Sequence, residues 1–370
     1  MDYSKELCLT WIASAGLPPM LLRSLLQSEM SPIQIFTRFQ QHGSFTSEIP
    51  LSVNMVTALK QNSSPAVMNM WKKKLSLHHI HVMTAMDACF PERLREIPDS
   101  PEILFYQGSL SALERNTVAV VGSRNASRKG LEAARSISEK LSERGIGIVS
   151  GLAYGIDTAA HQGCLQGGSP TIAVMGCGLD MDYPAENAGL RKEILSHEGL
   201  ILSEYAPGEK PLGWHFPWRN RIISALGDCL AVMEARIRSG SMTSVHHALE
   251  QGKDVFVYPG DPGSPRSEGN HQLIREGAIY FTCAEDLTED MGWLDKTEDV
   301  RQNNGHDNME VHVSPLEKKV LDELEAGERS FEQLLDVLGI PASALNASLS
   351  MLQIQGLIKA LPGKRFEKTV

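Results

Sequence analysis

Short apolar runs alternate with amphipathic stretches through the middle of this 370-residue chain. The apolar runs are residues 117–121, 146–150, 171–175, 200–203, 229–233, 254–258 and 278–281. Strand, helix, strand at this spacing indicates βαβ units and a parallel sheet covered by helices. The runs are apolar throughout, as expected when both faces of a sheet are covered. The sequence therefore predicts an α/β fold, a Rossmann-like doubly wound parallel sheet over residues 76–292.

The segments beside this region predict a small domain and a linker. Residues 1–75 contain short helical patterns that begin at prolines, as at Pro18-Pro19 and Ser31-Pro32. Proline suits the first helical position, so we expect a small helical domain of the SAM or helix-hairpin-helix type. Residues 293–313 are polar and aperiodic, which predicts a linker.

Residues 314–370 predict a winged helix. Capping boxes at Ser314 and Ser330 begin two helices, a third helix covers 341–355, and a hairpin pattern follows. The third helix would be the recognition helix, yet it contains no Lys or Arg and offers only Asn346, Gln353 and Gln355. A helix in a DNA groove needs such side chains for phosphates and base edges. We therefore expect protein docking or a structural appendage here.

Charge and cysteine usage exclude several classes of protein. Lys and Arg number 35 against 45 Asp and Glu, a net charge of −10, which excludes a uniformly basic nucleic-acid coat. No apolar run reaches the roughly 18–20 residues that span a bilayer, and the N-terminus has acidic residues where a signal peptide would be basic. The six cysteines are scattered without a CxxC pair. We expect a reduced, cytoplasmic protein without a membrane segment.

Glycine- and serine-rich loops follow the predicted strands, where ligands of open parallel sheets bind. Backbone amides at such loops and helix N-termini bind phosphates. Residues 116–145 carry six basic and three acidic residues, so charge is locally positive in an acidic chain. We predict a site for a polyanion; the alternative is ordinary glycine turns with solvated charges. The candidate residues are Gly122, Ser123, Arg124, Gly151, Ser239, Gly240 and Ser241.

Cofactor and catalytic patterns are weak by comparison. The first loop lacks GxGxxG, and Met181 stands where a third glycine would follow Gly176 and Gly178, so we expect no dinucleotide cofactor. Asp157 and His161 lie four residues apart and could form an acid–base pair, although an aspartate there more often caps its own helix. No metal-ligand set or nucleophile–base set is evident, so we expect no metal, no cofactor and no catalysis.

Aromatic and basic residues alternate in the long loop expected after residue 203. Trp214, Phe216 and Trp218 stand beside Arg219, Asn220 and Arg221. Unpaired bases stack on aromatic rings while cations follow the phosphates, whereas duplex bases are already stacked. This pattern predicts binding of single-stranded nucleic acid. The alternative is that both tryptophans fill a hydrophobic corner of the domain.

The motifs over residues 75–290 resemble the DNA-processing protein A family (DprA, also called Smf). They read VAVVGSRNASRKG, IVSGLAYGIDTAAHQGCL, GCGLDMDYP, HFPWRNRIIS and EARIRSGSMTS, in consistent order. The resemblance implies a cytoplasmic bacterial protein that binds single-stranded DNA. It further implies that the protein loads the RecA recombinase against single-strand-binding protein during natural transformation. Such proteins are homodimers joined through the Rossmann-like domain and have no known catalytic activity.

The resemblance also implies roles for single residues. Arg124 would hold a phosphate and Phe216 would stack on a base, while the segments Arg219–Arg221 and Ser239–Ser241 would line the same groove. Relatives often carry a lysine three residues before that phenylalanine. Gly213 stands there in this chain, and the nearest lysine is Lys210. If Lys210 does not reach the groove, one phosphate contact is lost.

Two other functions are compatible with the predicted fold. Rossmann-like phosphoribohydrolases, which cleave nucleoside monophosphates, carry PGGxGTxxE with a catalytic glutamate. The comparable run here, residues 238–243, is followed by His246 where that carboxylate would stand. A protein adaptor with a degenerate pocket is the third possibility.

Overall fold

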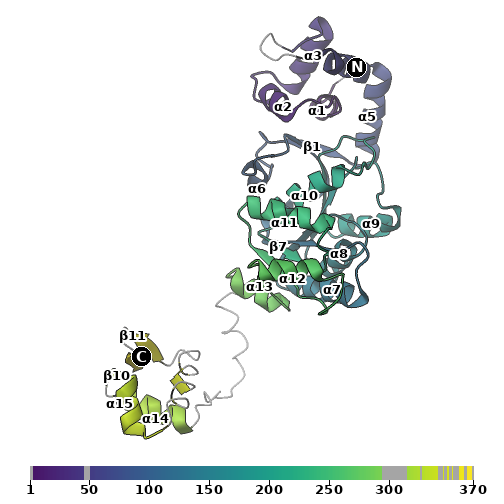
Figure 1. Ribbon diagram of the computed structural model, residues 1–370. Coiled ribbons are helices and arrows are strands. Elements are labelled where there is room, and N and C mark those ends of the chain that lie inside the picture. Colours follow the sequence, from purple (N-terminus) through teal and green to yellow (C-terminus); the bar gives the residue numbers. More distant parts are fainter. Residues whose placement is uncertain are drawn as a thin grey trace. The chain divides into compact units, whose positions relative to one another are not determined.

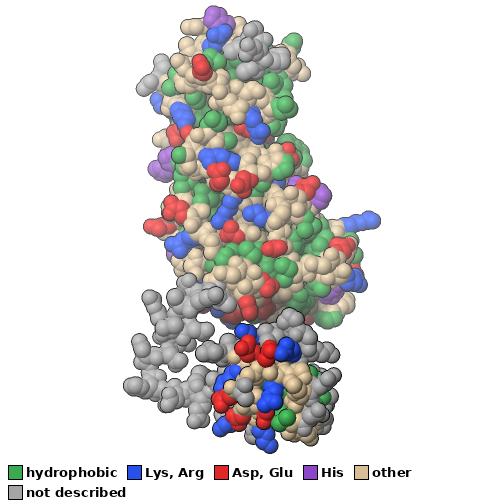
Figure 2. Space-filling model, turned by 90° about the vertical axis from the view of Figure 1, so that its left-hand side faces the viewer, with side chains coloured by type: hydrophobic (Ala, Val, Ile, Leu, Met, Phe, Trp, Pro, Cys, Tyr) green, Lys and Arg blue, Asp and Glu red, His purple; other side chains and the backbone are tan. Residues whose placement is uncertain are grey.

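The computed structural model describes residues 3–45, 51–293, 315–325, 327–340, 345, 348–349, 352, 358–361 and 365–368. It divides into two compact units, Met1–Leu294 and Asp295–Val370, which are described separately. Within those described ranges, no helix has both the length and the apolar character needed to cross a membrane. Figure 2 shows basic and acidic side chains interspersed over the face it draws, in keeping with a modest net charge spread over the surface.

A nine-stranded sheet forms the centre of the first unit, in the order β1-β2-β6-β5-β4-β3-β7-β8-β9. Strands β3 to β9 are mutually parallel, which confirms the predicted doubly wound sheet. Their bounds are β3 Thr117–Val121, β4 Gly147–Ser150, β5 Thr171–Met175, β6 Leu200–Ser203, β7 Cys229–Val232, β8 Val255–Val257 and β9 Ile279–Tyr280. From β3 the chain builds outward to β6, then returns to β7 on the other side, so the strand order reverses between β3 and β7.

Two strands were not predicted. β1 (His81–Thr84) and β2 (Ile103–Gly108) are antiparallel to their neighbours and extend the sheet beyond β6. No helix connects them in the βαβ manner, since only the short α6 (Glu92–Arg95) lies between them. The repeat of strand and long helix that revealed the other seven strands is therefore missing here.

Helices cover both faces of the sheet, because alternate strand residues point to opposite sides. Val118 and Val120 pack with α7 and α8, whereas Ala119 and Val121 pack with α10 and α11. The bounds of these and the remaining sheet helices are α7 Arg128–Glu143, α8 Ile156–Gly167, α9 Ala188–Ser196, α10 His215–Leu226, α11 Gly240–Glu250, α12 Glu268–Arg275 and α13 Ala284–Asp290, with short 3-10 helices at Leu110–Glu114 and Ala185–Asn187.

Five helices precede the sheet and lie beyond β1 at one end of the unit (Figure 1). They are α1 Lys5–Ala13, α2 Pro19–Leu26, α3 Pro32–His42, α4 Val53–Asn62 and α5 Pro65–Leu77. The prolines at 19 and 32 occupy the first helical position, as predicted. Each supplies the backbone angle that a helix start needs without losing a hydrogen bond.

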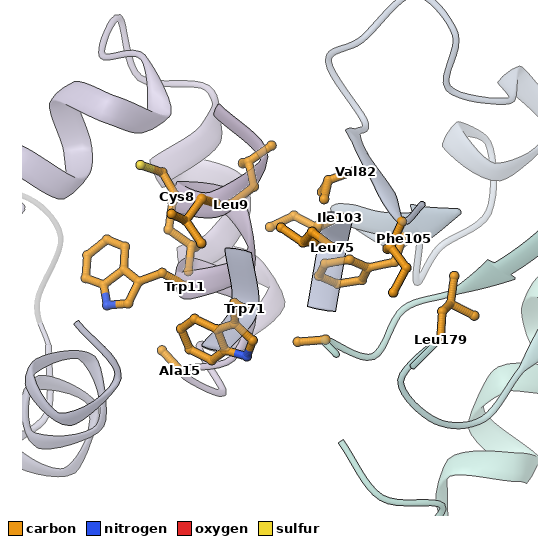
Figure 3. Packing of buried hydrophobic residues seen from close by; sticks show 14 of the residues in the cluster. Cys8, Leu9, Trp11, Ala15, Trp71, Leu75, Val82, Ile103, Phe105 and Leu179 are labelled. Carbon is orange, nitrogen blue, oxygen red and sulfur yellow. The ribbon is translucent and has the colours of Figure 1, made fainter. Parts of the chain in front are cut away.

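The N-terminal helices and the sheet share one hydrophobic core. Figure 3 shows Leu75 of α5 beside Ile103 and Phe105 of β2, while Trp71 of α5 and Trp11 of α1 lie farther along the same cluster. The indole Nε1 of Trp71 also donates to the carbonyl oxygen of Pro207, at 3.1 Å. The predicted domain boundary at residue 75 falls inside this continuous packing, and whether the two parts fold separately stays a prediction.

The second unit contains α14 (Pro315–Leu324), α15 (Phe331–Leu338) and a sheet of order β10-β12-β11. Its strands are β10 Arg329–Ser330, β11 Ile358–Leu361 and β12 Arg365–Lys368. Ser330 begins α15 with the predicted capping box, and β11 and β12 pair as the predicted hairpin. Most of the predicted linker 293–313, the Ser314 box and most of the predicted third helix 341–355 lie outside the described residues.

Candidate functional site

A cleft opens at the carboxyl ends of the strands, where the strand order reverses between β3 and β7. This is where ligands of open α/β sheets bind. The cleft, called the main cleft below, has a volume of about 570 Å³. The predicted residues that line it are Gly122, Ser123, Arg124, Phe216, Arg219, Asn220, Ser239, Gly240 and Ser241. Gly151 lines a smaller pocket that adjoins it through Arg124, Phe216 and Arg219.

Glu234 fastens the loops after β3 and β7 to each other. Its backbone oxygen accepts from the amide of Ser123 at 2.7 Å. Its buried carboxylate accepts from the amide of Ser127 at 2.9 Å and from the Ser127 hydroxyl at 2.6 Å. Because Ser127 also caps α7, the Gly-Ser-Arg loop is held from both ends.

Two glycines near the cleft leave room for side chains that pack directly against their backbone. A Cβ on Gly151 would lie 2.6 Å from Nη2 of Arg219, and a Cβ on Gly176 would lie 2.9 Å from Cδ1 of Phe216. Contacts this short do not occur without displacement of the neighbour. The absence of these two side chains therefore sets the positions of the guanidinium and the ring.

Arg124 and Phe216 meet at the mouth of the main cleft. The guanidinium carbon of Arg124 lies 5.2 Å from the centroid of the Phe216 ring, and Tyr183 stacks on the same ring at 5.4 Å with planes 28° apart. Arg124 is exposed, and no carboxylate among the described residues pairs with it, whereas nearby Arg128 pairs with Glu132. An unpaired cation beside an aromatic face can hold a phosphate and a base together.

Arg219 forms the floor of the main cleft and is not a free cation. It is buried, and its Nη1 donates to the carbonyl oxygen of Gly151 at 2.9 Å and to that of Val174. Burial lowers the pKa of the guanidinium to about 10, and the carboxylate of Asp157 opposes this shift. Arg219 therefore remains protonated at neutral pH and ties the ends of β4 and β5 together.

Asp157 and His161 do not form the acid–base pair that their spacing allowed. The Asp157 carboxylate accepts from the amides of Gly151 and Ala153 at 3.1 and 3.3 Å. The Nδ1 of His161 lies 2.8 Å from the hydroxyl of Thr171 instead. Burial lowers the pKa of His161 to about 3. Burial also raises the pKa of the Asp157 carboxyl, and the positive charge of Arg219 opposes that increase. Both side chains stabilise backbone and helix positions.

Arg221 and Lys210 are not among the residues that line the main cleft. The Nε of Arg221 donates to the carbonyl oxygen of Asp99 at 2.9 Å, and its Nη2 pairs with Glu204 at 2.7 Å. Its guanidinium also lies 4.3 Å from the ring of Trp218. Lys210 is exposed, and its neighbour Pro211 lines the main cleft. Whether Lys210 contacts DNA in the main cleft stays a prediction.

The separation of Arg219 from Arg221 follows from secondary structure. The segment that sequence reasoning treated as a loop forms the first turns of α10, which begins at His215. Residues three or four apart share one face of a helix. Phe216, Arg219 and Asn220 consequently face the main cleft, while Trp218 and Arg221 face the opposite side.

Tyr154 and Tyr183 belong to the site but were not predicted. Both line the smaller pocket, and the hydroxyl of Tyr154 donates to the carboxylate of Glu186. The signal for Tyr183 was its position in the loop after β5, where ligand-binding residues are expected. Around the pocket, three aromatic side chains surround a space next to Arg124.

The geometry favours binding of an anion with a planar group. His246, which stands where the rival hydrolase would have its glutamate, is exposed and pairs with Glu250 at 3.2 Å outside the cleft lining. Within the part of the chain that the structure describes, no three His, Cys, Asp or Glu side chains are grouped to hold a metal ion. The described groups that line the cleft are amides, hydroxyls, aromatic rings, the exposed guanidinium of Arg124, and the buried Arg219 with the carboxylate of Asp157.

Comparison with known families gives two matches. The family model described as DNA recombination-mediator protein A matches residues 81–292. The model described as DprA winged helix domain matches residues 308–364, which confirms the predicted fold of the C-terminal segment.

Individual relatives agree with these matches. The chain is 48% identical over 202 residues to the DNA processing protein DprA of Streptococcus pneumoniae, covering 55% of this chain and 71% of that protein. It is 38% identical over 288 residues to the protein Smf of Escherichia coli, covering 76% of each.

Two solved structures are similar in fold. The X-ray structure of DNA processing protein A from Streptococcus pneumoniae superposes with a TM-score of 0.60 at 36% identity, covering 78% of this chain and 99% of that one. A structure of DNA processing protein A from Helicobacter pylori, described for its single-stranded DNA binding mode, gives 0.53 at 29% identity, covering 58% and 98%.

Proposed function

The chain belongs to the DNA recombination-mediator protein A (DprA/Smf) family, and we propose that it binds single-stranded DNA in the main cleft without altering it chemically. The observation that carries this proposal is the placement of the exposed Arg124 guanidinium 5.2 Å from the Phe216 ring. A phosphate can pair with the cation while the adjacent base stacks on the aromatic face. The relative from Helicobacter pylori, which is described for binding single-stranded DNA, supports this choice of ligand.

The cleft favours unpaired strands for a physical reason. Stacking on an aromatic side chain is worth about 1–3 kcal/mol per base when the base is free. A base in a duplex is already stacked on its neighbours and would have to leave them first. Amides and hydroxyls around Gly122 and Gly240 can donate hydrogen bonds to the phosphate backbone beyond the stacked base, since both glycines line the cleft and Gly240 begins α11.

In the cell, the protein would act as a mediator of recombination. We propose that it takes up incoming single strands in the cytoplasm during natural transformation, displaces single-strand-binding protein and loads the RecA recombinase. It would work as a homodimer, and neither a cofactor nor catalysis is needed for this task. Family membership supports the role, and the polyanion-binding cleft supplies a place for the strand.

Fluorescence anisotropy with one labelled oligonucleotide, alone and annealed to its complement, tests the proposal at two salt concentrations. We expect tight, salt-dependent binding of the single strand and weak binding of the blunt duplex. Phe216→Ala should weaken single-strand binding by about 1–3 kcal/mol and leave the salt dependence unchanged. Arg275→Ala is a matched surface control, because this exposed arginine ends α12 and lies away from the cleft lining. Equal affinity for the two forms of DNA would contradict the proposal.

A further inference from the structure

A second cavity lies on the other side of α10, between the N-terminal helices and the sheet. It has a volume of about 740 Å³ and is bounded by residues 13–23 on one side and by residues 98–103 and the start of α10 on the other. We call it the junction groove. None of its lining residues lines the main cleft, so the two cavities are separate sites.

Aromatic side chains are open to solvent along the junction groove. Trp214 is 63% exposed and Trp218 is 38% exposed, so neither fills a hydrophobic corner. Tyr205 stacks on His215 with centroids 3.8 Å apart, and Trp214 stands edge-on to His215 at 4.1 Å. Two accessible indole rings on a rigid aromatic base are unusual for a surface without a partner.

Three buried polar atoms at the junction groove have no hydrogen-bond partner among the residues that the structure describes: Oγ of Ser100, Oε2 of Glu204 and Nε2 of His215. The Nδ1 of His215 lies 3.0 Å from the carbonyl oxygen of Gly176, so in the neutral ring Nδ1 carries the proton and Nε2 presents a lone pair. The carboxylate oxygen is also an acceptor. Both acceptors are covered by surrounding atoms, so they make this side of the groove electronegative rather than contacting a ligand directly.

The charges around the junction groove are negative in excess. Its two arginines are already paired, Arg23 with Glu102 at 2.6 Å and Arg221 with Glu204 at 2.7 Å. The exposed carboxylates of Asp99 and Glu209 also line the groove, and neither forms an ion pair within the described ranges. A polyanion such as DNA would be repelled here, whereas a cation would be attracted.

We propose that the junction groove docks a segment of a partner protein that carries arginine or lysine. The charge of a guanidinium or ammonium group complements the exposed carboxylates of Asp99 and Glu209 and the electronegative wall at Glu204 and His215. The faces of Trp214 and Trp218 add cation–π attraction, as Arg221 already shows with the ring of Trp218 at 4.3 Å. The apolar side chains of residues 17–22 on the facing wall suit the aliphatic neighbours of such a residue.

Binding of a labelled pentapeptide, Ala-Arg-Leu-Arg-Ala, to the full chain tests this proposal by fluorescence anisotropy. Two versions serve as comparisons, one with citrulline in place of each arginine, which keeps the shape without the charge, and one with glutamate. We expect the citrulline version to bind about tenfold more weakly and the glutamate version not to bind. Failure of the arginine peptide to bind at millimolar concentration, or equal binding of all three, overturns the proposal.

Substitutions in the junction groove test whether the peptide binds there. Trp214→Ala and Glu209→Gln should each weaken peptide binding about threefold or more, in line with a cation–π contact or a charge pair at an exposed site. Glu193→Gln, an exposed site on α9, should change nothing. Because Glu209 is exposed and outside the main cleft, Glu209→Gln should bind single-stranded oligonucleotide as the unaltered chain does. Unchanged peptide affinity in both groove variants, or displacement of the peptide by spermidine at equal concentration, overturns docking of a protein segment here.

Discussion

Arg124 and Arg221 are two arginines of equal charge for which the structure gives opposite roles. Arg124 is exposed beside Phe216 in the main cleft, while Arg221 is buried in an ion pair with Glu204 on the far side of α10. Replacing each with alanine removes one positive charge from the first unit of the chain. If both arginines contacted DNA, as the sequence predicted, both changes would weaken DNA binding alike. The structure predicts different outcomes in different measurements.

The magnitude for Arg124→Ala follows from counterion release. Each phosphate neutralised on a single strand contributes about 0.7 to the slope of log affinity against log salt. A fourfold rise in salt, as from about 50 to 200 mM, then costs each such contact a factor of about 2.6 in affinity. The affinity of Arg124→Ala should therefore fall about 2.6-fold less than that of the unaltered chain over this range.

Arg221→Ala should act on stability instead. The side chain of Arg221 is 3% exposed and that of Glu204 is 25% exposed, so the change leaves a largely buried carboxylate without its partner. Breaking a buried pair in this way costs about 3 kcal/mol, at the lower end of the usual range because Glu204 retains some solvent. The salt slope of DNA binding should remain that of the unaltered chain.

Two assays separate these outcomes. Anisotropy titrations of a labelled single strand at four salt concentrations give the slope, and urea unfolding followed by circular dichroism gives the stability. Arg275→Ala should alter neither slope nor stability by a measurable amount. A reduced salt slope in Arg221→Ala, or an unchanged slope in Arg124→Ala, would refute the assignment of the two arginines to opposite sides of α10.

Three further changes have outcomes that follow from the packing. Gly176→Ala should weaken single-strand binding by about 1 kcal/mol or more without changing its salt slope, because the added Cβ would lie 2.9 Å from Phe216 and displace the stacking ring; anisotropy checks this. His161→Gln should make stability depend less steeply on pH in acid, because burial holds the pKa of His161 at about 3 in the folded chain, whereas the unfolded chain takes up a proton there below about pH 6.5. Urea unfolding should show that the unaltered chain loses about 1.4 kcal/mol more per pH unit than the variant between roughly pH 5.5 and 4. Phe105→Ala should cost about 3–5 kcal/mol and leave a single unfolding transition, because this buried ring belongs to the core that the N-terminal helices share with the sheet; two separate transitions would contradict a shared core.

The sequence predicted the parallel sheet because its strands are separated by long helices that repeat the same pattern. β1 and β2 escaped prediction since an antiparallel pair needs no such helix, and four to six residues of apolar sequence carry little signal alone. The loops after β3, β4 and β7 were predicted as site residues from one rule, that ligands bind at the carboxyl ends of strands. That rule depends only on topology, so it needs no knowledge of where side chains point.

What the sequence could not provide is the direction in which each side chain points. Arg219 and Arg221 are two residues apart and chemically identical, and only the start of α10 at His215 places them on different sides. Burial of Arg219 depends on Gly151, which lies in the loop after β4, far away in sequence. Tyr183 was missed for a similar reason, because its stacking on Phe216 joins two loops that are separated along the chain.

The opening turns of α10 make the length of this segment as important as its composition. Each residue advances a helix by about 100°, so one residue inserted or deleted between Phe216 and Arg219 would swing everything after it by more than a quarter of a turn. A deletion would place the guanidinium of Arg219 at the position of Trp218, which faces the junction groove, although no amino acid had been exchanged. We therefore expect relatives of this chain to tolerate substitutions along this stretch far more readily than gaps.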